Sequence, residues 1–370
     1  MSDLQNMIED SVSRLFGDLV TRKSREAFDR DGTYETLWQA CRDAGLERAM
    51  ASEAHGGIAA TPAEAFAILH AIGYHAAATP LADTLVAGWL LSTAGIKPPE
   101  GAIALLGKHH SAVGLRCKPG LEQGETVTGQ VSRAAWGTQA AWGVASLHSA
   151  CEDDQPRIAL INLEQGACVR VASSPNRAGE PTADLKFDAA GIQASAVLAW
   201  RGVSDPVLHA GALARSVQMV GALERVLELS VQYALERSQF GKPIGKNQAL
   251  QQMLAALAGQ IASARCASII ACSGNANSAF DIAVAKVRAS EAAGLGAGIA
   301  HQVHGAIGFT QEHELHFFTR RLWSWRSEFG TDAWWSQQLG RAAIAVGPEN
   351  FWSSVVARSW AVPNSGNVTT

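Results

Sequence analysis

The sequence predicts an α+β protein, because the spacing of its apolar residues changes twice along the 370-residue chain. From Leu4 to about Gly95, and again from Pro206 to about Trp360, apolar residues recur at three- and four-residue steps. This is the period of helices that bury one face. Between these stretches apolar and polar residues alternate, which is the period of β-strands. We therefore expect two helical parts separated by a small antiparallel β part.

This pattern divides the chain into three domains and a tail. Glycines and Asp/Asn turns separate the alternating segments of the middle part, as they do in a sheet of short strands. We place an N-terminal helical domain at 1–100, a middle β domain at 101–204, a C-terminal antiparallel helix bundle at 205–361 and a loose polar tail at 362–370.

Two short stretches predict helix starts in the first domain. Thr61-Pro62 followed by Glu64 combines a threonine cap, a proline in the first turn and a carboxylate at the third position. Thr79-Pro80 followed by Asp83 repeats this order and predicts a second start.

Helices of the C-terminal domain follow from the three- and four-residue period and its breaks. Gly241 and Pro243 end the first of them. We expect helices at 207–236, 246–272, 277–303, 311–325 and 332–358.

Composition excludes several classes of protein. The chain is 47% hydrophobic and 17% charged, with a net charge of −4, as in a soluble protein with large cores. It has no Lys/Arg-rich run, so we expect neither nucleic acid nor an anionic membrane as a partner. Every apolar run of membrane-spanning length contains a charge or a turn residue. Its six cysteines form no Cys-x-x-Cys pair, and its start lacks the order of a signal peptide, so we expect reduced thiols and a cytoplasmic protein.

The stretch from Tyr233 to Gln248 carries the residue that we rank first for binding. Arg237 lies in the last turn of a predicted helix and precedes a Phe240-Gly241 corner. A guanidinium held beside backbone amides suits a pyrophosphate or another paired oxyanion. The alternative is an arginine that caps the carbonyls of its own helix.

Two motifs resemble those of the acyl-CoA dehydrogenases. Arg237, Phe240, Gly241 and Gln248 are similar to the family's Arg-x-x-Phe-Gly-x-x-x-x-x-x-Gln signature. The block 302–309 resembles the Gln-x-x-Gly-Gly-x-Gly-Phe element, and Gly330-Thr331 follows at the family's distance.

The resemblance implies a fold, a cofactor and a reaction. Acyl-CoA dehydrogenases have an N-terminal helical domain, a middle β-barrel and a C-terminal helix bundle, and they use FAD to desaturate acyl-CoA thioesters. The middle domain here is shortened, because Gly101 to Gly124 lacks the family's Thr-Glu-Pro tract. In the family, certain positions reach the adenine and pyrophosphate of a neighbouring subunit's FAD. Their counterparts here are Arg237, Phe240, Asn247, Gln248, Gln302, Gly305 and Thr331.

The glutamate that removes the α proton has no counterpart at either family position. The commoner position, immediately before the Gly-Thr pair, holds Phe329, and the rarer one, near the start of the helix that ends at Arg237, holds Gly211. Neither side chain accepts a proton. Glu328 is a candidate substitute, but one residue along a helix rotates a side chain by about 100 degrees. Its ordinary role would be an ion pair with Arg321 or Arg326 on a surface or subunit boundary.

These features resemble the base-less subunit of heterotetrameric α2β2 acyl-CoA dehydrogenases that act on bulky steroid side-chain thioesters. The resemblance implies an acyl-CoA substrate, a catalytic partner subunit and an electron-transfer flavoprotein as acceptor. Two alternatives stay open. One is a self-sufficient homo-oligomer that uses Glu328 as its base, and the other is a non-catalytic scaffold that binds acyl-CoA or a partner.

Three further patterns favour structure over chemistry. Gly294 to Gly298 lacks the third glycine of a nucleotide loop, and small residues at this spacing favour close helix packing. The histidines His301, His304, His313 and His316 have zinc-like spacing but no accompanying carboxylate or cysteine set, so we expect no metal. Tryptophans that could form either an apolar interface or core packing are Trp323, Trp325, Trp334, Trp335 and Trp352.

Overall fold

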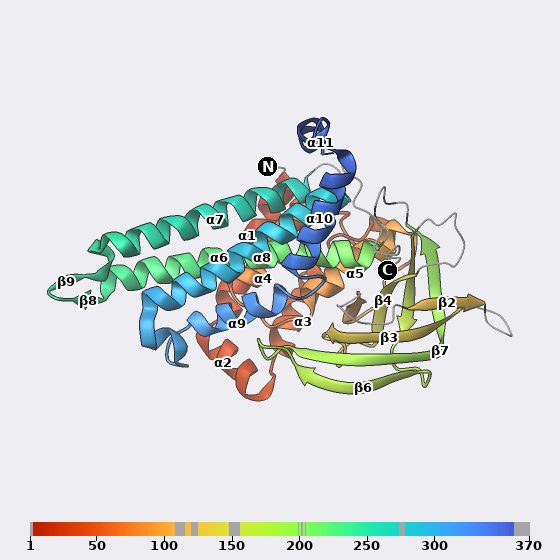
Figure 1. Ribbon diagram of the computed structural model, residues 1–370. Helices are drawn as coiled ribbons and strands as arrows, with labels where there is room; N and C mark the ends of the chain where they lie inside the picture. The colour runs from red at the N-terminus through yellow and green to blue at the C-terminus, as the bar shows by residue number, and fades with distance from the viewer. Residues whose placement is uncertain are drawn as a thin grey trace.

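The structure is a computed structural model that places a helix bundle beside a curved sheet (Figure 1). The long helices of the second half of the chain run across the molecule, the N-terminal helices pack on them, and the strands lie at one end. The residues that it describes are 3–107, 115–119, 125–147, 156–198, 200, 203, 205–273 and 278–358. Half of the segment 101–124, which replaces the family's Thr-Glu-Pro tract, and the whole polar tail lie outside these residues.

The first part of the chain is helical, as predicted. Its helices are α1 (Asp3–Leu19), α2 (Arg22–Asp31), α3 (Glu35–Asp43), α4 (Pro62–Tyr74) and α5 (Leu81–Thr93), with single 3-10 turns η1 (Leu46–Arg48) and η2 (Glu53–His55) between α3 and α4.

Only one of the two predicted helix starts has the expected cap. At α4 the Thr61 hydroxyl accepts a hydrogen bond from the Glu64 amide, and the Glu64 carboxylate accepts one from the Thr61 amide at 2.9 Å. The second helix also starts where it was predicted, since α5 begins after Pro80, but the capping arrangement differs. The Thr79 hydroxyl accepts from the Leu81 amide at 3.3 Å, and Asp83 does not cap the helix. Asp83 instead lies 1% exposed inside the protein, where it faces α6.

Seven strands form the middle sheet. They are β1 (Ile103–Leu106), β2 (Arg116–Pro119), β3 (Glu125–Ala135), β4 (Trp142–Leu147), β5 (Arg157–Asn162), β6 (Cys168–Pro175) and β7 (Pro181–Val197). The order is β1-β4-β5-β7-β3-β2, with β6 also paired to β7. The first half of β7 pairs with β3 and β6 and its second half with β5, so the sheet bends along this strand into a half-barrel. The pairing is antiparallel as predicted, except that β1 and β4 are parallel.

The third part is a bundle of long helices. It contains α6 (Pro206–Glu236), α7 (Gln248–Cys272), α8 (Ala279–His304), α9 (Leu315–Trp325), α10 (Asp332–Val346) and α11 (Phe351–Ala357). Between α6 and α7 lie the short strands β8 (Ser238–Gln239) and β9 (Lys242–Pro243) and the turn η3 (Ile244–Lys246), and η4 (Gly305–Phe309) follows α8.

Four of the five predicted helices in this part are present, and the last one is broken. The single helix expected at 332–358 was wrong, because Gly347 adopts φ +79° and Pro348 follows it. A left-handed glycine and a proline that lacks an amide proton cannot continue a helix. The chain therefore turns between α10 and α11.

Glycines let the long helices approach one another closely. A Cβ atom at Gly73 of α4 would lie 1.9 Å from the Gln218 carbonyl oxygen of α6, and one at Gly221 of α6 would lie 2.1 Å from the His70 carbonyl oxygen of α4. The backbones of α4 and α6 thus touch at this crossing. Gly296 of α8 meets Leu223 of α6 in the same way, which confirms packing as the role of the glycine-rich stretch.

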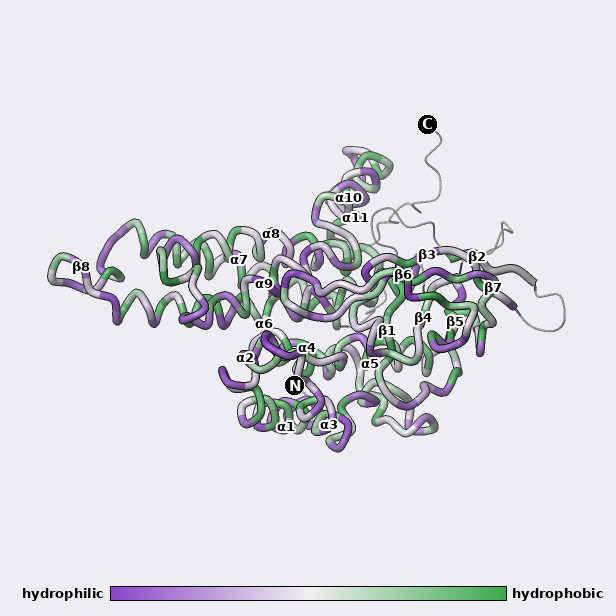
Figure 2. Tube along the Cα trace, turned by 90° about the horizontal axis from the view of Figure 1, so that it is seen from below, coloured by the Kyte–Doolittle hydropathy of each residue, from purple (hydrophilic) through white to green (hydrophobic). Residues whose placement is uncertain are grey.

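The helix α7 exposes an apolar surface. Among the described residues it is the one helix with the length and hydropathy of a membrane span, although only 22% of that window is buried. A single helix of this kind is weak evidence for a membrane. Its exposed residues include Ala255, Ala258, Ala262, Ile269 and Ile270. Figure 2 shows the alternation of hydrophobic and hydrophilic positions along the bundle.

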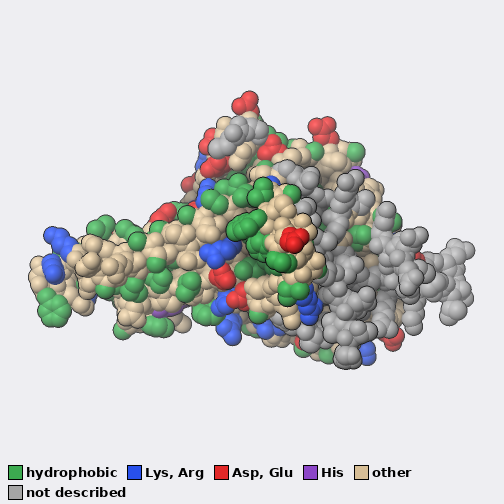
Figure 3. All heavy atoms as spheres, turned by 45° about the horizontal axis from the view of Figure 1, so that its top comes forward, with side chains coloured by type: hydrophobic (Ala, Val, Ile, Leu, Met, Phe, Trp, Pro, Cys, Tyr) green, Lys and Arg blue, Asp and Glu red, His purple; other side chains and the backbone are tan. Residues whose placement is uncertain are grey.

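A second apolar region lies on α10 and α11. Ile344, Trp352 and Val356 are 84%, 72% and 79% exposed. Hydrophobic side chains gather near the centre of the face drawn in Figure 3. Core packing is confirmed for Trp325 and Trp335, which are buried in the bundle, whereas Trp334 is partly buried and Trp323 is 39% exposed.

Candidate active site and cofactor contacts

The two positions at which the family carries its base lie face to face. Phe329, in the loop between α9 and α10, is only 1% exposed. A Cβ atom at Gly211 of α6 would lie 2.4 Å from the Cδ1 atom of Phe329, and one at Gly107 would lie 2.9 Å from it. The aromatic ring therefore fills the space above Gly211, and no larger side chain fits there beside it.

The backbone at Phe329 is held in an uncommon conformation. Its φ is +52°, which is rare for a bulky side chain and costs of the order of 1–3 kcal/mol. Two contacts hold it there. The Trp335 Nε1–H group donates to the Phe329 carbonyl oxygen at 2.9 Å, and the Arg215 guanidinium lies 5.2 Å above the ring.

Glu328 points away from Phe329 into a buried ion pair. Its carboxylate lies 2.6 Å from Nε of Arg215 and accepts a hydrogen bond from Asn176 at 3.2 Å. The residue is 8% exposed. The carboxylate is thus already used by a cation and an amide of the same chain.

The expected partners of Glu328 were wrong. Arg321 pairs with Glu180 at 3.2 Å, inside the protein, and Arg326 pairs with Asp332 at 2.8 Å. Glu328 reaches neither arginine in this arrangement, because the loop turns its side chain toward α6.

Arg215 binds two carboxylates from different domains. It donates to Oδ2 of Asp83 of α5 at 3.1 Å as well as to Glu328, and its third nitrogen donates to Gln218 at 2.8 Å. Burial raises the pKa of Asp83 to about 6. Burial opposes the charge of Arg215, yet the two carboxylates hold its pKa above the ordinary value. Neither Arg215 nor Asp83 was predicted from the sequence to be a site residue, although each is a single charged residue within an apolar stretch.

A buried lysine supports the same loop from the other side. Lys286 of α8 is 0% exposed, and its ammonium donates to the Trp325 carbonyl oxygen at 2.7 Å. This carbonyl is at the C-terminal end of α9, where a cation is favourable. Burial lowers the pKa of Lys286 to about 7. The loop that carries Phe329 is therefore held by charged groups of both α6 and α8.

Arg237 lies beside a hairpin that projects from the end of the bundle (Figure 1). The strands β8 and β9 are joined by Phe240 and Gly241, whose φ values of +51° and +77° are typical of a two-residue hairpin turn. Phe240 is 100% exposed. The Arg237 side chain is also exposed, and it has no hydrogen-bond or ion-pair partner in the described part of the chain. The helix-capping alternative is therefore not observed.

The other predicted cofactor residues separate into two places. Gln248, at the start of α7, and Gln302 and Gly305, at the end of α8, are exposed at the hairpin end of the bundle. Asn247 lies with them, and its side chain caps α7 by accepting from the Ala249 amide at 3.0 Å.

Thr331 lies apart from this group. Its hydroxyl caps α10 by accepting from the Trp334 amide, and it follows Phe329 and Gly330 at the buried loop. Thr331 thus belongs to the start of α10, whereas Arg237 follows the end of α6.

The hairpin end presents a guanidinium and an aromatic ring, two of the groups that the resemblance assigned to a nucleotide. An unpartnered guanidinium is a bidentate donor for a pyrophosphate, and an exposed aromatic ring offers a stacking surface. Keeping a fully exposed phenylalanine in a left-handed backbone conformation is costly, which is consistent with a contact outside this chain.

Comparison with known proteins identifies the family. Residues 200–344 match the family model described as acyl-CoA dehydrogenase, C-terminal domain. The acyl-CoA dehydrogenase IpdE2 of Mycobacterium tuberculosis is 28% identical over 86% of this chain and 89% of its own length. The acyl-CoA dehydrogenase FadE27 of the same organism is 29% identical over 80% and 83%. This chain belongs to the acyl-CoA dehydrogenase family. Its class of activity is therefore that of an oxidoreductase acting on CH–CH groups.

Solved structures show the same fold over nearly the whole chain. The ChsE4-ChsE5 complex from Mycobacterium tuberculosis matches with a TM-score of 0.80 at 22% identity, covering 94% of this chain and 99% of that one. The steroid acyl-CoA dehydrogenase Tcur3481-Tcur3483 matches with a TM-score of 0.82 at 20% identity, covering 95% and 98%. The predicted architecture of the acyl-CoA dehydrogenase fold is thereby confirmed.

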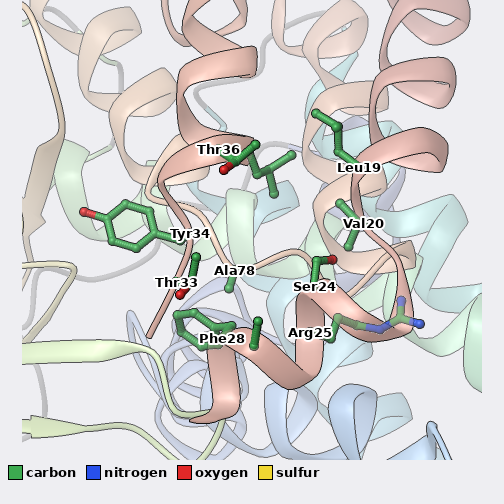
Figure 4. Close-up of a pocket in the computed structure, with 11 residues that line it drawn as sticks. Leu19, Val20, Ser24, Arg25, Phe28, Thr33, Tyr34, Thr36 and Ala78 are labelled. Carbon is green, nitrogen blue, oxygen red and sulfur yellow. The ribbon is translucent and has the colours of Figure 1, made fainter. Parts of the chain in front are cut away.

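A pocket in the N-terminal helices of this acyl-CoA dehydrogenase lies outside the candidate site (Figure 4). Its volume is about 210 Å³, and its lining comes from α1, α2, α3 and Ala78, without any residue of α6 or of the loop at Phe329. Arg25 contributes to the wall, but its guanidinium binds Glu314 at 2.6 Å and the His75 carbonyl oxygen at 3.0 Å. The pocket is therefore mainly apolar.

The histidines of the α8 end contact one another and nearby aromatic rings. Across the described residues, no group of three or more His, Cys, Asp or Glu side chains is placed to hold a metal ion. His304 stacks on Tyr233, with ring centroids 4.7 Å apart, and its edge meets His313 at 4.5 Å. Among the described cysteines Cys41, Cys168 and Cys272 are buried and Cys266 is exposed.

Proposed function

We propose that this chain is the base-less subunit of a two-gene, FAD-dependent acyl-CoA dehydrogenase. In this proposal it contributes Arg237, Phe240, Gln248, Gln302 and Gly305 to the FAD of a partner subunit. The partner supplies the carboxylate that removes the α proton of the acyl-CoA thioester. Thr331 acts at a different place, because it lies at the buried loop.

The observation that carries the proposal is the Phe329 ring above Gly211. Both family positions for the base hold side chains that accept no proton, and the ring of one fills the space of the other. Glu328, the alternative base, is bound to Arg215 and Asn176. A base must reach the proton that it abstracts, so a carboxylate fixed on an internal arginine is poorly placed for this task.

FAD, when bound, accepts the β hydride of the substrate. The residues of this chain have a supporting role in that reaction. The Arg237 guanidinium would pair with the pyrophosphate, and the exposed Phe240 ring would cover the adenine end of the cofactor. The exposed apolar residues of α7 supply a surface on which a second subunit can pack.

The structural neighbours suggest the partner and the substrate class. One of them is a complex of two different chains, and another is described as a steroid acyl-CoA dehydrogenase. We therefore propose a hetero-oligomer that acts on a bulky, steroid-derived acyl-CoA in the cytoplasm, with an electron-transfer flavoprotein as acceptor.

Co-expression with a neighbouring dehydrogenase gene tests the proposal. We expect the chain alone to purify without flavin, and the complex to purify yellow and to reduce an electron acceptor with an acyl-CoA. In the complex, Arg237→Ala should lower the FAD content at least about tenfold, because a charge-assisted bidentate contact is lost. Arg30→Ala, an exposed arginine of α2, is the control and should leave the FAD content unchanged.

Three results would contradict the proposal. A chain that binds FAD and oxidises an acyl-CoA by itself would favour the homo-oligomer, and Glu328→Gln would then abolish its activity. A complex without flavin would favour a scaffold. A yellow complex whose FAD content is unchanged by Arg237→Ala would show that Arg237 does not contact the FAD of the partner subunit.

A further inference from the structure

The ends of α6 and α8 are joined by a group of histidines and a tyrosine, which we call the histidine lock. It consists of Tyr233, His301, His304 and His313. The His304 ring is 3% exposed and lies between Tyr233, stacked at 4.7 Å, and His313, at 4.5 Å. His301 stacks on Phe309 of η4 at 4.3 Å. The lock thus connects α6, α8, η4 and the segment before α9.

Hydrogen bonds fix the neutral form of two of these rings. The Leu315 amide donates to Nδ1 of His313 at 3.1 Å, so this nitrogen carries a lone pair and the ring proton sits on Nε2. Nδ1 of His304 lies 2.8 Å from the Ala300 carbonyl oxygen and donates to it. Its Nε2 atom is buried and has no hydrogen-bond partner.

A proton on either ring disturbs this arrangement. On His313 the added proton would occupy Nδ1, which now accepts a hydrogen bond from the Leu315 amide, so this bond would be lost. Nδ1 also lies at the N-terminal start of α9, where the helix dipole disfavours a positive charge. On His304 the added proton would place a charge on a ring that is 3% exposed, although the Leu229 and Ala300 carbonyl groups favour the charged form and offset part of this cost. Two charged rings 4.5 Å apart would also repel each other.

The surroundings do not offset such a charge fully. Burial lowers the pKa of His301, His304 and His313. For His313, Arg22 and His316 act in the same direction as burial and Glu314 opposes them. The Glu314 carboxylate is itself paired with Arg25 at 2.6 Å. Other charged groups on the elements packed at the lock include Arg225, Glu228 and Glu236 of α6, Arg237 at its end and Glu312 next to His313, as well as Asp29 of α2 and Arg320 of α9. Glu228 is paired with Arg225 at 3.0 Å, and Asp29 binds Arg320.

The sign of the pH effect follows from these shifts. A histidine whose pKa is lowered in the closed lock takes up a proton more readily when the lock is open. Below the ordinary histidine pKa of 6.5 the open state therefore gains protons first, and the closed state loses stability as the pH falls. Above that value the lock is fully stable.

We propose that the histidine lock positions Arg237, Gln302 and Gly305 relative to one another and releases them when the pH falls. Tyr233 lies one helical turn before Arg237, and His304 is flanked by Gln302 and Gly305, so the Tyr233–His304 stack ties together the two elements that carry these residues. The link to cofactor binding rests on the proposed function, whereas the opening of the lock does not.

Hydrogen–deuterium exchange on the isolated full-length chain tests the lock without any cofactor. Exchange is compared at pH 7.5 and 5.5 after correction for the intrinsic pH dependence of amide exchange. We expect protection of peptides from 229–237 and 300–315 to fall by about tenfold at pH 5.5, the change that one titrating group gives over one pH unit. Peptides from α5 should keep their protection.

The variant His313→Asn separates titration from packing. Asparagine can place its Oδ1 atom where Nδ1 of His313 now accepts the Leu315 amide, but it does not titrate. We expect its protection at pH 7.5 to match the wild type and its loss at pH 5.5 to be much smaller. His55→Asn, at a histidine of the N-terminal domain, should behave as the wild type.

Several results would overturn the proposal. One is an equal loss of amide protection at pH 5.5 in His313→Asn and in the wild type. The others are no loss of protection at 229–237 and 300–315 in the wild type, or a loss of protection in peptides from the whole molecule. If His313→Asn does not fold, NMR titration of the wild-type histidines replaces it as the test. Lock histidines that titrate near pH 6.5 while the amide exchange of 229–237 and 300–315 stays unchanged would overturn the proposal. FAD content of the partner complex at pH 7.5 and 5.5 is measured separately. Flavin missing at both pH values would count against the proposed function alone.

Discussion

Arg215 lies buried between two carboxylates, so its charge is compensated only while both remain in place. Asp83 belongs to the N-terminal helices and Glu328 to the loop before α10, and the three residues connect parts of the chain that are far apart in sequence. Such networks add little to the free energy of unfolding when they are intact. Removing one member costs far more, because the remaining charged groups are then buried without a partner.

Replacing Arg215 by methionine should therefore destabilise the protein strongly. We expect Arg215→Met to lower the free energy of unfolding by about 3–5 kcal/mol, since Asp83 and Glu328 lose their shared cation. Urea unfolding followed by circular dichroism measures the change. Arg22→Met, which removes the exposed pair with Glu26, is the control and should leave the midpoint nearly unchanged. Equal effects of the two variants would show that the buried network does not stabilise the fold.

At the scale of single residues, the sequence identified the positions but not their partners. The motifs assigned roles to Phe329, Gly211 and Arg237, yet nothing in a linear pattern shows that Phe329 packs on Gly211. The pairing of Arg215 with Glu328 joins residues 113 positions apart. Glu328 was expected near Arg321 or Arg326 because those arginines are close in sequence, whereas the loop turns it toward α6.

Helix–helix contacts at the scale of elements depend on where glycines occur. Gly73 and Gly221 lie at the α4–α6 crossing, where the backbones touch, whereas Gly259 of α7 has no other atom within 4 Å of its Cβ position. The same residue type thus has opposite consequences in two helices of one bundle.

Alanine substitution should reveal this difference. Gly221→Ala would place a methyl group 2.1 Å from the His70 carbonyl oxygen, and we expect a loss of about 1–3 kcal/mol or more. Gly259→Ala meets no atom and should stabilise the protein by up to about 1 kcal/mol, because alanine is the better helix former. Thermal unfolding of both variants measures the changes. A stabilising Gly221→Ala would mean that α4 and α6 do not touch.

At this scale the periodicity predicted the elements well and their ends less well. The helices of the bundle follow their apolar stripes, but the stripe continues past Gly347, where the backbone turns. Thr79-Pro80-Asp83 has the composition of a helix cap and α5 does begin there, but Asp83 binds the buried Arg215 of α6 and not the helix end. Both differences arise from backbone conformation or tertiary contacts that a local pattern does not contain.

For the molecule as a whole, the exposed apolar helix α7 requires an explanation. A helix with the hydropathy of a membrane span and little burial is more exposed than a folded monomer usually tolerates. Association with another subunit would cover Ala258, Ala262 and the neighbouring apolar residues.

A charge on this surface should weaken association without unfolding the chain. We expect Ala262→Arg, an exposed position of α7, to reduce co-purification with the partner subunit at least about tenfold, because the guanidinium would be desolvated at the interface. Ser11→Arg, on the exposed side of α1, should have no effect. Light scattering after size-exclusion chromatography measures the assembly, and circular dichroism shows whether the fold is retained. An unchanged assembly in Ala262→Arg would place the interface elsewhere.

The helix crossing at which Gly73 faces Gln218 and Gly221 faces His70 also limits how the protein can be recombined with its relatives. A chimera that takes its first helices from another member and its bundle from this chain inherits only one half of the crossing. If the helix from the other member carries a side chain in place of Gly73, it cannot pack against α6 at the present distance between the two backbones. Recombination between the N-terminal helices and the bundle would therefore yield folded hybrids only when Gly73 and Gly221 come from the same parent protein or are replaced together.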